Sequence, residues 1–494
     1  ITIGLEAPRD DSLYARSDET GVVVVGGDVR KLLEAPVASF RDRRLFSFPV
    51  GAIVQLGISR STGQLALQRR ITEPKQDWAL AEPIKDWASR EKMDELLSDL
   101  GNLRIDDVVT DSPGGQTIPS PLPDEAAVLQ VRVFGVEQPL TIYLRQVEAP
   151  VVEGAPATIE ARVSDRPAVY RLQSRFLETL PGSADEIRDR SLARIPAEYV
   201  DSIVIQSRID PHVDLRASAA GNARQWEVTI NDKLVPANNN AIAELIAGVN
   251  EAAILNFVAD EDPNLADFGL LPPSRRVTFN LRFPSVTRQD GSVVPAQGLE
   301  RVLNLGWQEG DQQRLYAHFE GEPGVVELDP SFVSFIPTHP IKWRSLNVLT
   351  FNPFHLVSIT RVLPNQENLK LVYENRRDRW EAIKNGTDAT DTLDIAAVRR
   401  LRDRLGSLTA KGWFLSLARA NQALETPSAT FVIETNEFDL AVGKARPKTY
   451  TIHFAEAAAT DVYFGKVEGS PDVFYLDSET FRELKRPVTT SQLR

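Results

Sequence analysis

The sequence has no cysteine among its 494 residues and only one methionine. Without cysteine the chain forms no disulfide, no thiolate nucleophile and no zinc–thiolate site. An exported protein from a bacterium that does not rely on disulfides fits this composition, and so does a cytosolic protein, so cysteine usage leaves the compartment open. No stretch approaches about 18 consecutive apolar residues, so the sequence predicts no membrane-spanning helix.

An excess of positive charge is also missing. The chain has 56 Lys and Arg against 69 Asp and Glu, a net charge of -13. Such a chain repels phosphate backbones, so we expect no nucleic-acid partner. The densest basic run, RRLRDR at 399–404, falls in a helical pattern, where arginines cover a solvated face.

Motifs for nucleotide and nucleophile chemistry are absent as well. The sequence contains no G-x-S-x-G elbow, no G-x-x-x-x-G-K-[ST] loop and no G-x-G-x-x-G turn. No histidine has a second histidine four residues later, so no zinc site is spelled out locally. We therefore predict no catalytic residue, no cofactor and no metal site. The histidines are His212, His318, His339, His355 and His453.

Two acidic clusters are the remaining candidates for chemistry. They are Asp106 with Asp107, and Asp260, Glu261 and Asp262. Paired carboxylates can act as general acid and base or hold a hard cation. Both clusters lie just past a predicted helix and lack the spacing of a calcium loop, so solvated loop charge is the favoured interpretation.

The sequence does contain a repeated pattern. VVVVGGDVRKLLEAP at 22–36 combines a strand-like run, a turn and a short helix-like run that ends at proline. The same pattern of strand-like run, turn and short helix-like run recurs at 169–181, 325–337 and 473–487. Self-similarity at a fixed period is the signature of a repeat architecture.

An arginine-bearing corner follows three of these prolines. It reads RDRRL from Arg41, RDRSL from Arg188 and KWRSL from Lys342. Arg41 with Arg43, and Arg188 with Arg190, are suited to fork-like binding of a carboxylate. Because the corner recurs at one place in successive units, we predict a structural role, bridging a helix end to the next strand or to the neighbouring repeat.

Three tryptophans recur along the chain with nearly the same spacing as the arginine-bearing corners. They are Trp78, Trp226 and Trp380. Each follows two runs of alternating apolar residues, which predict strands because side chains alternate faces at period two. Each pair of runs and its tryptophan strand predicts a three-stranded antiparallel meander. We expect the three tryptophans to pack in cores or between units, although a sugar platform is the alternative.

A helix is predicted after each meander. Its apolar residues recur at i, i+3, i+4 and i+7, a stripe that faces a core. Asn240 and Asp394 stand at the expected starts of the second and third helices, where a short oxygen side chain accepts from unpaired N–H groups. The stripes are Met93, Leu96, Leu97 and Leu100; Ile242, Leu245, Ile246 and Val249; and Val398, Leu401 and Leu405.

These patterns together predict an α+β fold. We expect tandem repeats of mixed, mostly antiparallel sheet with packed helices, in an elongated multi-domain arrangement. The predicted whole units are 41–187, 188–341 and 342–494. Residues 1–40 read as the back half of a unit whose front half is missing, so we expect about 100 further residues before Ile1, preceded by a membrane anchor.

Three short sequence motifs carry a family resemblance: DWALAEP before a predicted helix, FGLLPPSRRVTF after one, and VYRLQSRFLETL leading to IRDRSL. Their order resembles tandem copies of the bacterial family called domain of unknown function 4340. The resemblance implies a periplasmic, membrane-anchored protein encoded with ABC transporters of the gliding-motility auxiliary kind. The family has no established catalytic residues to carry over.

Our leading functional hypothesis is therefore a non-catalytic extracytoplasmic scaffold or binding arm, tethered to the inner membrane. Its partner would be a membrane protein complex, such as ABC transporter subunits. One alternative is a cryptic hydrolase of envelope polymers, built from acidic residues that converge between units. Another is a carbohydrate- or peptide-binding module that uses exposed Trp307, Trp343 and Trp413.

Overall fold

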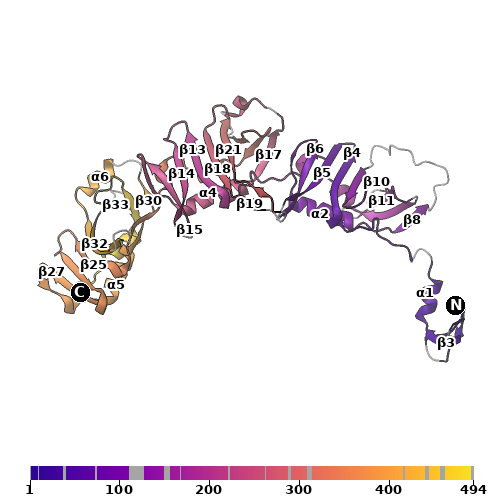
Figure 1. Cartoon of the computed structure of the whole chain (residues 1–494), viewed down its shortest axis with the longest axis horizontal. Helices are drawn as coiled ribbons and strands as arrows, with labels where there is room; N and C mark the ends of the chain where they lie inside the picture. The colour runs from indigo at the N-terminus through magenta and orange to yellow at the C-terminus, as the bar shows by residue number, and fades with distance from the viewer. Residues whose placement is uncertain are drawn as a thin grey trace. The chain divides into compact units, whose positions relative to one another are not determined.

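The computed structural model divides the chain into two compact units, Ile1–Arg190 and Ser191–Arg494, and each is described by itself (Figure 1). Its elements are mostly antiparallel strands with a few helices, in agreement with the predicted α+β class. Every strand pair among the described residues is antiparallel. The structure describes residues 2–8, 11–19, 21–36, 40–72, 75–110, 127–148, 156–166, 168–220, 223–261, 263–287, 291–308, 314–414, 418–439, 444–456 and 462–490.

The first unit begins with a small module of three strands and one helix. The strands pair in the order β1-β2-β3, and α1 follows the last of them. Few side chains of this module are buried, among them Leu13 and Ala15 of the middle strand. The elements are β1 (Thr2–Glu6), β2 (Ser12–Ser17), β3 (Gly21–Gly26) and α1 (Asp28–Glu34).

Three nine-stranded sheets follow, one in the first unit and two in the second. When the strands of each sheet are numbered along the chain, all three have the order 4-3-2-1-6-7-8-9-5. A front meander and a back meander therefore join through their first strands, and the fifth strand closes the far edge. The front meanders contain the strand pairs that the alternating runs predicted.

The bounds of these elements are as follows. The first sheet contains β4 (Ile53–Arg60), β5 (Gly63–Thr72), β6 (Lys75–Glu82), β7 (Asp86–Trp87), β8 (Asp107–Thr110), β9 (Ala127–Val133), β10 (Leu140–Glu148), β11 (Ala157–Val163) and β12 (Val169–Ser174). The second contains β13 (Val200–Ser207), β14 (Val213–Ala220), β15 (Ala223–Ile230), β16 (Lys233–Pro236), β17 (Ile254–Ala259), β18 (Arg275–Phe283), β21 (Gln297–Gln308), β22 (Arg314–Phe319) and β23 (Val325–Leu328). The third contains β25 (Leu356–Val362), β26 (Leu369–Glu374), β27 (Arg379–Lys384), β28 (Thr387–Asp388), β30 (Gly412–Trp413), β31 (Ala429–Asp439), β32 (Lys444–Glu456), β33 (Val462–Val467) and β34 (Phe474–Asp477).

The remaining elements are short pairs of strands and helices. Two small sheets pair β19 (Val286–Thr287) with β20 (Val293–Val294), and β24 (Asn347–Thr350) with β29 (Ser407–Thr409). The helices are α2 (Arg90–Gly101), α3 (Phe176–Thr179), α4 (Asn239–Glu251), α5 (Ile395–Gly406), α6 (Ala418–Leu424) and α7 (Ser478–Lys485). The 3₁₀-helices are η2 (Val50–Ala52), η3 (Ala184–Glu186), η4 (Ala197–Tyr199), η5 (Leu265–Phe268), η6 (Pro330–Phe335), η7 (Pro340–Trp343), η8 (Pro353–His355), η9 (Asn375–Arg377) and η10 (Thr390–Thr392).

One face of each sheet is apolar and packs against a helix. In β9 the sequence AVLQVRV alternates, so that Ala127, Leu129, Val131 and Val133 are buried. All residues of the three predicted helix stripes are buried on α2, α4 and α5, as predicted. Each stripe belongs to the core of its own sheet, and Figure 1 shows α2 and α4 lying against their sheets.

The helices start where short polar side chains accept from backbone N–H groups. Ser89 accepts from the N–H of Lys92, and Asp394 from that of Ala397, as expected for an N-cap. The prediction for the second helix was wrong by two residues. Asn238 is its cap, and Asn240 lies in the first turn, because the first helical hydrogen bond runs from the N–H of Ile242 to the carbonyl of Asn238.

None of the helices in the described part of the chain is long and apolar enough to cross a membrane. Their hydrophobic residues form stripes of three or four, and the opposite faces are charged or polar. The apolar side chains are used in the sheet cores instead.

Candidate functional site

The three tryptophans selected from the sequence lie in the three sheet cores. Trp78, Trp226 and Trp380 are buried, with exposed fractions of 5, 8 and 2 %. The Arg69 guanidinium lies 5.3 Å from the centre of the Trp78 ring, and that of Arg224 lies 5.4 Å from Trp226. Arg69 lies across the strand pair from Trp78, and Arg224 precedes Trp226 by two residues in the same strand. Buried rings beneath such cations are packing elements, and this position leaves no open face for a sugar.

The four arginines of the predicted corner do not share one environment. Arg41, Arg43 and Arg190 have exposed side chains, whereas Arg188 is buried. The Arg188 Nε donates to Asp86 Oδ2 at 2.7 Å, and its Nη1 lies 3.2 Å from Asp185 Oδ1. The arginines that the sequence spacing placed at equivalent positions therefore differ in burial.

The structure also revises which residue corresponds to Arg188. The backbone of Arg188 bridges Ala88, just before the cap of α2, and the backbone of Arg344 bridges Ala237, just before the cap of α4. In the second sheet the residue equivalent to Arg188 is therefore Arg344 and not Lys342, which lies two residues earlier. The side chain of Lys342 is exposed. The two arginines correspond because the backbone of each pairs with the start of a helix in the tertiary structure. This pairing allows the number of residues between the helix and the corner to vary.

This pairing recurs in all three sheets. The N–H of the helix cap donates to the carbonyl of Ile187 in the first sheet, of Trp343 in the second and of Val488 in the third. All three acceptor residues are buried in the core of the sheet that they follow. Trp343 lies two residues beyond the predicted 341/342 boundary, and it packs with the second sheet.

Arg344 connects the second and third sheets, which belong to one compact unit. Its Nη1 pairs with Asp472 Oδ2, just before β34, and both side chains are about one fifth exposed. Its guanidinium lies 3.7 Å from the centre of the Trp413 ring in β30. Trp413 in turn donates from Nε1 to the carbonyl of Ser345 at 3.0 Å.

Sequence reasoning missed three further arginines that share one task. Arg60 donates to the carbonyl of Leu180, Arg275 to that of Ile336, and Arg361 to that of Arg486, at 2.6, 2.7 and 2.7 Å. Each carbonyl stands at the residue before the repeated proline, which ends the short helical run. The arginine therefore satisfies a carbonyl that the helix leaves unpaired. Arg60 and Arg361 lie near the ends of the first strands of their sheets, β4 and β25, whereas Arg275 begins β18, so no single sequence signal joins all three.

Two of these three arginines have altered protonation equilibria. Burial lowers the pKa of the Arg361 guanidinium and of the Arg275 guanidinium from the ordinary value. Arg361 is only 3 % exposed. Because arginine stays charged at any physiological pH, the consequence is structural: a buried cation fixed on a carbonyl.

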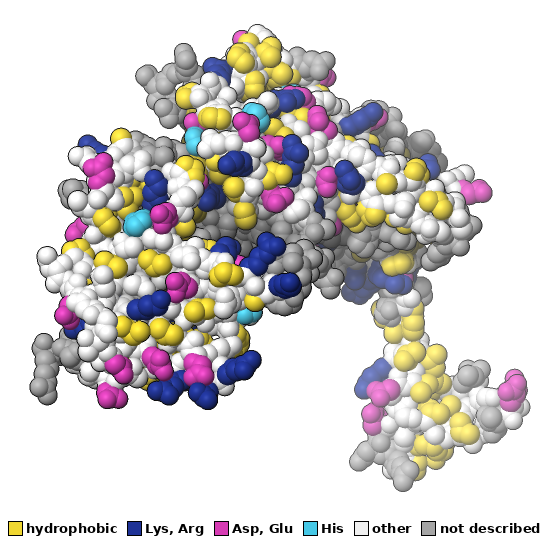
Figure 2. Space-filling model, turned by 60° about the vertical axis from the view of Figure 1, so that its left-hand side comes forward, with side chains coloured by type: hydrophobic (Ala, Val, Ile, Leu, Met, Phe, Trp, Pro, Cys, Tyr) yellow, Lys and Arg dark blue, Asp and Glu magenta, His cyan; other side chains and the backbone are white. Residues whose placement is uncertain are grey.

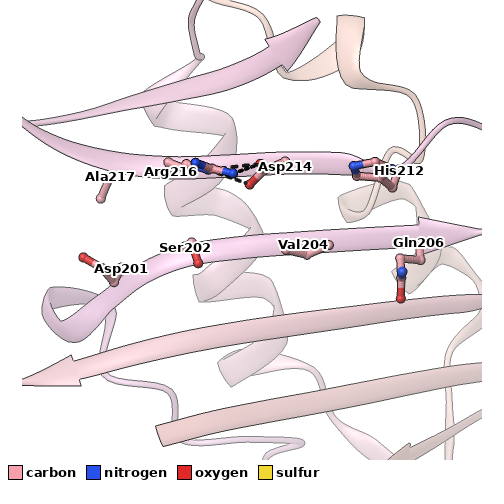
Figure 3. Close-up of a pocket in the computed structure, with 8 residues that line it drawn as sticks. All are labelled: Asp201, Ser202, Val204, Gln206, His212, Asp214, Arg216 and Ala217. Atoms are coloured by element: carbon pink, nitrogen blue, oxygen red, sulfur yellow. Dashed lines mark hydrogen bonds and ion pairs between the residues drawn. The ribbon is translucent and has the colours of Figure 1, made fainter. Parts of the chain in front are cut away.

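The open face of the second sheet carries a hollow (Figure 3). It has a volume of about 530 Å³ and lies over the neighbouring strands β13 and β14. Arg216 donates to both carboxylate oxygens of Asp214, with Nη2–Oδ2 and Nε–Oδ1 distances of 2.6 and 3.2 Å. This hydrogen-bonded carboxylate raises the pKa of the Arg216 guanidinium. The lining residues are Asp201, Ser202, Val204, Gln206, His212, Asp214, Arg216 and Ala217.

Polar contacts continue from this hollow across the same face. Asn280 on β18 donates to Ser202 Oγ at 3.0 Å. Arg276 donates to both oxygens of Glu320 at 2.9 and 3.0 Å, and Asn304 donates to the same carboxylate at 3.1 Å. The bond from Arg276 is the main cause of the lowered pKa of Glu320. The charges of this face thus neutralise one another.

The outward faces of the other two sheets have similar networks. On the first sheet Arg145 lies 2.5 Å from Glu160. On the third, Ser358 donates to Glu434 at 2.5 Å and Lys370 at 3.1 Å, and these bonds lower the pKa of Glu434. Each sheet thus presents one polar, internally paired face.

The acidic clusters are placed as local structure. Asp106 Oδ2 accepts from the N–H of Gln173 at 2.6 Å, and Asp107 accepts from Val108 at 2.8 Å. Glu261 is exposed, and Asp262 lies outside the described residues. Over the described ranges, no three His, Asp or Glu side chains gather as metal ligands would.

The aromatic alternative rested on three exposed tryptophans. Trp343 and Trp413 are buried, 1 and 6 % exposed, so the expectation of exposure was wrong for both. The Trp343 Nε1 donates to the carbonyl of Pro337 at 2.8 Å. Trp307 is half-buried against the second core. The sequence could not indicate this, because burial depends on the strands that cover each ring.

The N-terminal module differs from the sheets in its apolar exposure. Val22, Val24, Leu32 and Leu33 are each more than half exposed. Figure 2 shows hydrophobic side chains, coloured yellow, gathered on the surface of the small module. In α7 the comparable apolar residues, Phe481 and Leu484, are buried in the third core.

Comparison with known proteins gives one finding. A family model described as domain of unknown function (DUF4340) matches residues 1–121 and 226–423, which together exceed half of the chain. The first segment runs from β1 past β8, and the second from β15 to α6. A search of curated proteins finds no match. On this evidence the chain belongs to the DUF4340 family.

Proposed function

We propose that this protein is a non-catalytic scaffold or binding arm, built from tandem copies of one structural unit. The observation that carries the proposal is the identical strand order of the three nine-stranded sheets, each with one open polar face. Repeated units offer a series of similar surfaces along one chain, as other repeat proteins do. The arm acts on the extracytoplasmic side of a membrane, beside a transport complex, as the family resemblance implies.

The charge pattern supports binding over hydrolysis. A glycosidase-like hydrolase needs a carboxyl group whose pKa is raised, so that it can donate a proton near neutral pH. Among the described residues, every carboxyl group with an altered pKa is shifted downward, chiefly by hydrogen bonds. For Glu437, burial opposes this shift, and the bonds from Tyr450 and Lys448 outweigh it. The burial of Trp343 and Trp413 likewise weighs against an aromatic sugar platform.

The test is crosslinking in cells of the native full-length protein, followed by mass spectrometry. We expect an integral membrane transporter among the recovered proteins, with crosslinks on the open faces of more than one sheet. Recovery of the protein alone, or of soluble glycan fragments, would contradict the transporter link. Crosslinks confined to the hollow of Figure 3 would instead indicate a single-site binding module.

A further inference from the structure

The helices of the third sheet differ in charge from those of the first two. α2 carries two cations and four anions, and α4 carries two glutamates and no cation. α5 carries four arginines and one aspartate. Arg402 takes the fourth position of the packing stripe and lies over the Tyr373 ring, whereas Arg399 and Arg400 are exposed and lie outside the core.

A groove between α5 and α7 concentrates this charge. It has a volume of about 340 Å³, and three arginines line it: Arg400, Arg404 and Arg486. Its floor is apolar and closed, since Leu401 and Val488 are 4 and 1 % exposed. A ligand in this groove would therefore meet charged side chains at the rim.

The acidic residues of the groove are already neutralised. Glu483 lies 3.2 Å from the Nη2 of Arg404, and Asp403 lies 2.7 Å from the Nε of Arg402. In the part of the chain that the structure describes, no carboxylate pairs with Arg400 or with the guanidinium of Arg486. Two exposed cations thus face one concave surface without a counter-charge.

We propose that the α5–α7 groove binds an acidic segment of a partner protein through Arg400 and Arg486. Arginine forks match carboxylates in a bidentate geometry. An extended polyanion or an anionic bilayer would also meet the field of a chain with a net charge of -13. A short acidic peptide meets mainly the charges within one Debye length, about 10 Å at moderate salt, and these are locally positive. This inference deepens the proposed function, on which it rests, by naming the chemistry of a partner.

The experiment uses a fluorescein-labelled hexaglutamate peptide and the full chain, with binding followed by fluorescence anisotropy. The variant Arg400→Glu/Arg486→Glu should weaken binding at least about tenfold, because two attractive pairs become repulsive. Arg400→Lys/Arg486→Lys should lose less, because it keeps the charge and removes only the fork. The matched control Lys92→Glu/Lys233→Glu changes two exposed cations on α2 and β16 by the same net charge, and it should stay within about twofold.

Three results would overturn the inference: no binding by the native chain, an equal loss in the control, or unchanged binding in the charge-reversed variant. Circular dichroism establishes that each variant is folded before binding is compared. Binding to phosphatidylglycerol vesicles through the same arginines, without binding to the peptide, would also overturn it in favour of a membrane surface. If crosslinking recovers a transporter and the peptide does not bind, this inference fails while the proposed function stands.

Discussion

Arg188 and Arg344 occupy the same place beside the start of a helix, yet they hold different parts of the molecule. Arg188 pairs with Asp86 and Asp185 of its own unit. Arg344 pairs with Asp472 and stacks on Trp413, both of which belong to the next sheet along the chain. The second and third sheets form one compact unit, and the division of the chain falls at Arg190, just after Arg188.

The comparison indicates that backbone pairing and side-chain bonding do different work at these corners. The backbone bridge to Ala88 or Ala237 is common to both, and it positions the arginine. The side chain bonds to different carboxylates, Asp86 and Asp185 for Arg188 and Asp472 for Arg344. Where that carboxylate is on the following sheet, the arginine links two sheets, and where it is on the same sheet, the arginine fixes an edge.

Replacing Arg344 should have the largest effect. Arg344→Ala removes the cation that pairs with Asp472, a carboxylate whose side chain is only about one fifth exposed. We expect this unpaired charge to cost about 3 kcal/mol of local stability. Hydrogen exchange of β30 and β34 measures this loss, because a chain of several sheets has no single free energy of unfolding. Unchanged protection in β30 and β34 would show that the link between the sheets does not depend on this arginine.

Arg188→Ala should cost less, about 2 kcal/mol, because the carboxylates that it abandons are better hydrated. The side chains of Asp86 and Asp185 are 28 and 55 % exposed. We expect faster exchange at β7 and at residues 184–188, and unchanged exchange at β30 and β34. A loss of protection in the third sheet would remove the distinction between the two corners.

Trp413→Phe sharpens the comparison at the second corner. Phenylalanine keeps a ring for the Arg344 guanidinium and loses the Nε1 donor to Ser345. We expect a loss of about 1 kcal/mol, the typical contribution of one hydrogen bond. Exchange at β30 measures it, and a loss as large as that of Arg344→Ala would mean that the indole, and not the ion pair, holds the corner.

The smallest effect concerns pH. Asp477 caps α7, and bonds from the N–H and hydroxyl of Thr480 hold its pKa at about 2, below the ordinary 3.8. Because the folded pKa is the lower one, the cap contributes above about pH 4, and the contribution is lost as the pH falls toward 2. We expect a loss of about 1 kcal/mol or less.

The readout for this cap is exchange at residues 478–485, corrected for intrinsic rates, at about pH 5 and about pH 3. Asp477→Asn keeps the acceptor and should remove the pH dependence. The short α3 of the first sheet is the internal control, since no N–H of this helix bonds to the side chain of its cap, Arg175, which instead donates to Glu178. An equal acid response of α3 and α7 would refute the assignment.

Local patterns predicted the elements because their causes are local. The stripe Met93, Leu96, Leu97 and Leu100 follows from helical periodicity, and its burial on α2 required no knowledge of the partner. The cap at Asp394 follows from one side chain and one N–H. At the second helix the prediction named Asn240, whereas the cap is Asn238, the first of three consecutive asparagines.

Other features depended on contacts between distant residues. Arg60 and Arg361 serve the carbonyl before the repeated proline from the first strands of their sheets and Arg275 serves it from β18, so no single spacing rule finds all three. The exposure of Trp343 and Trp413 was misjudged for the same reason. Their rings are covered by strands and side chains far along the chain.

The sequence by itself determined the periodic pattern of strands and helices in this protein, because hydrophobic alternation and capping act within a few residues. Only the tertiary structure decided the strand order, the partner of each arginine and the groove between α5 and α7. These depend on which surfaces meet when the sheets close. Side-chain charges choose their partners by distance in space, which residue spacing does not encode.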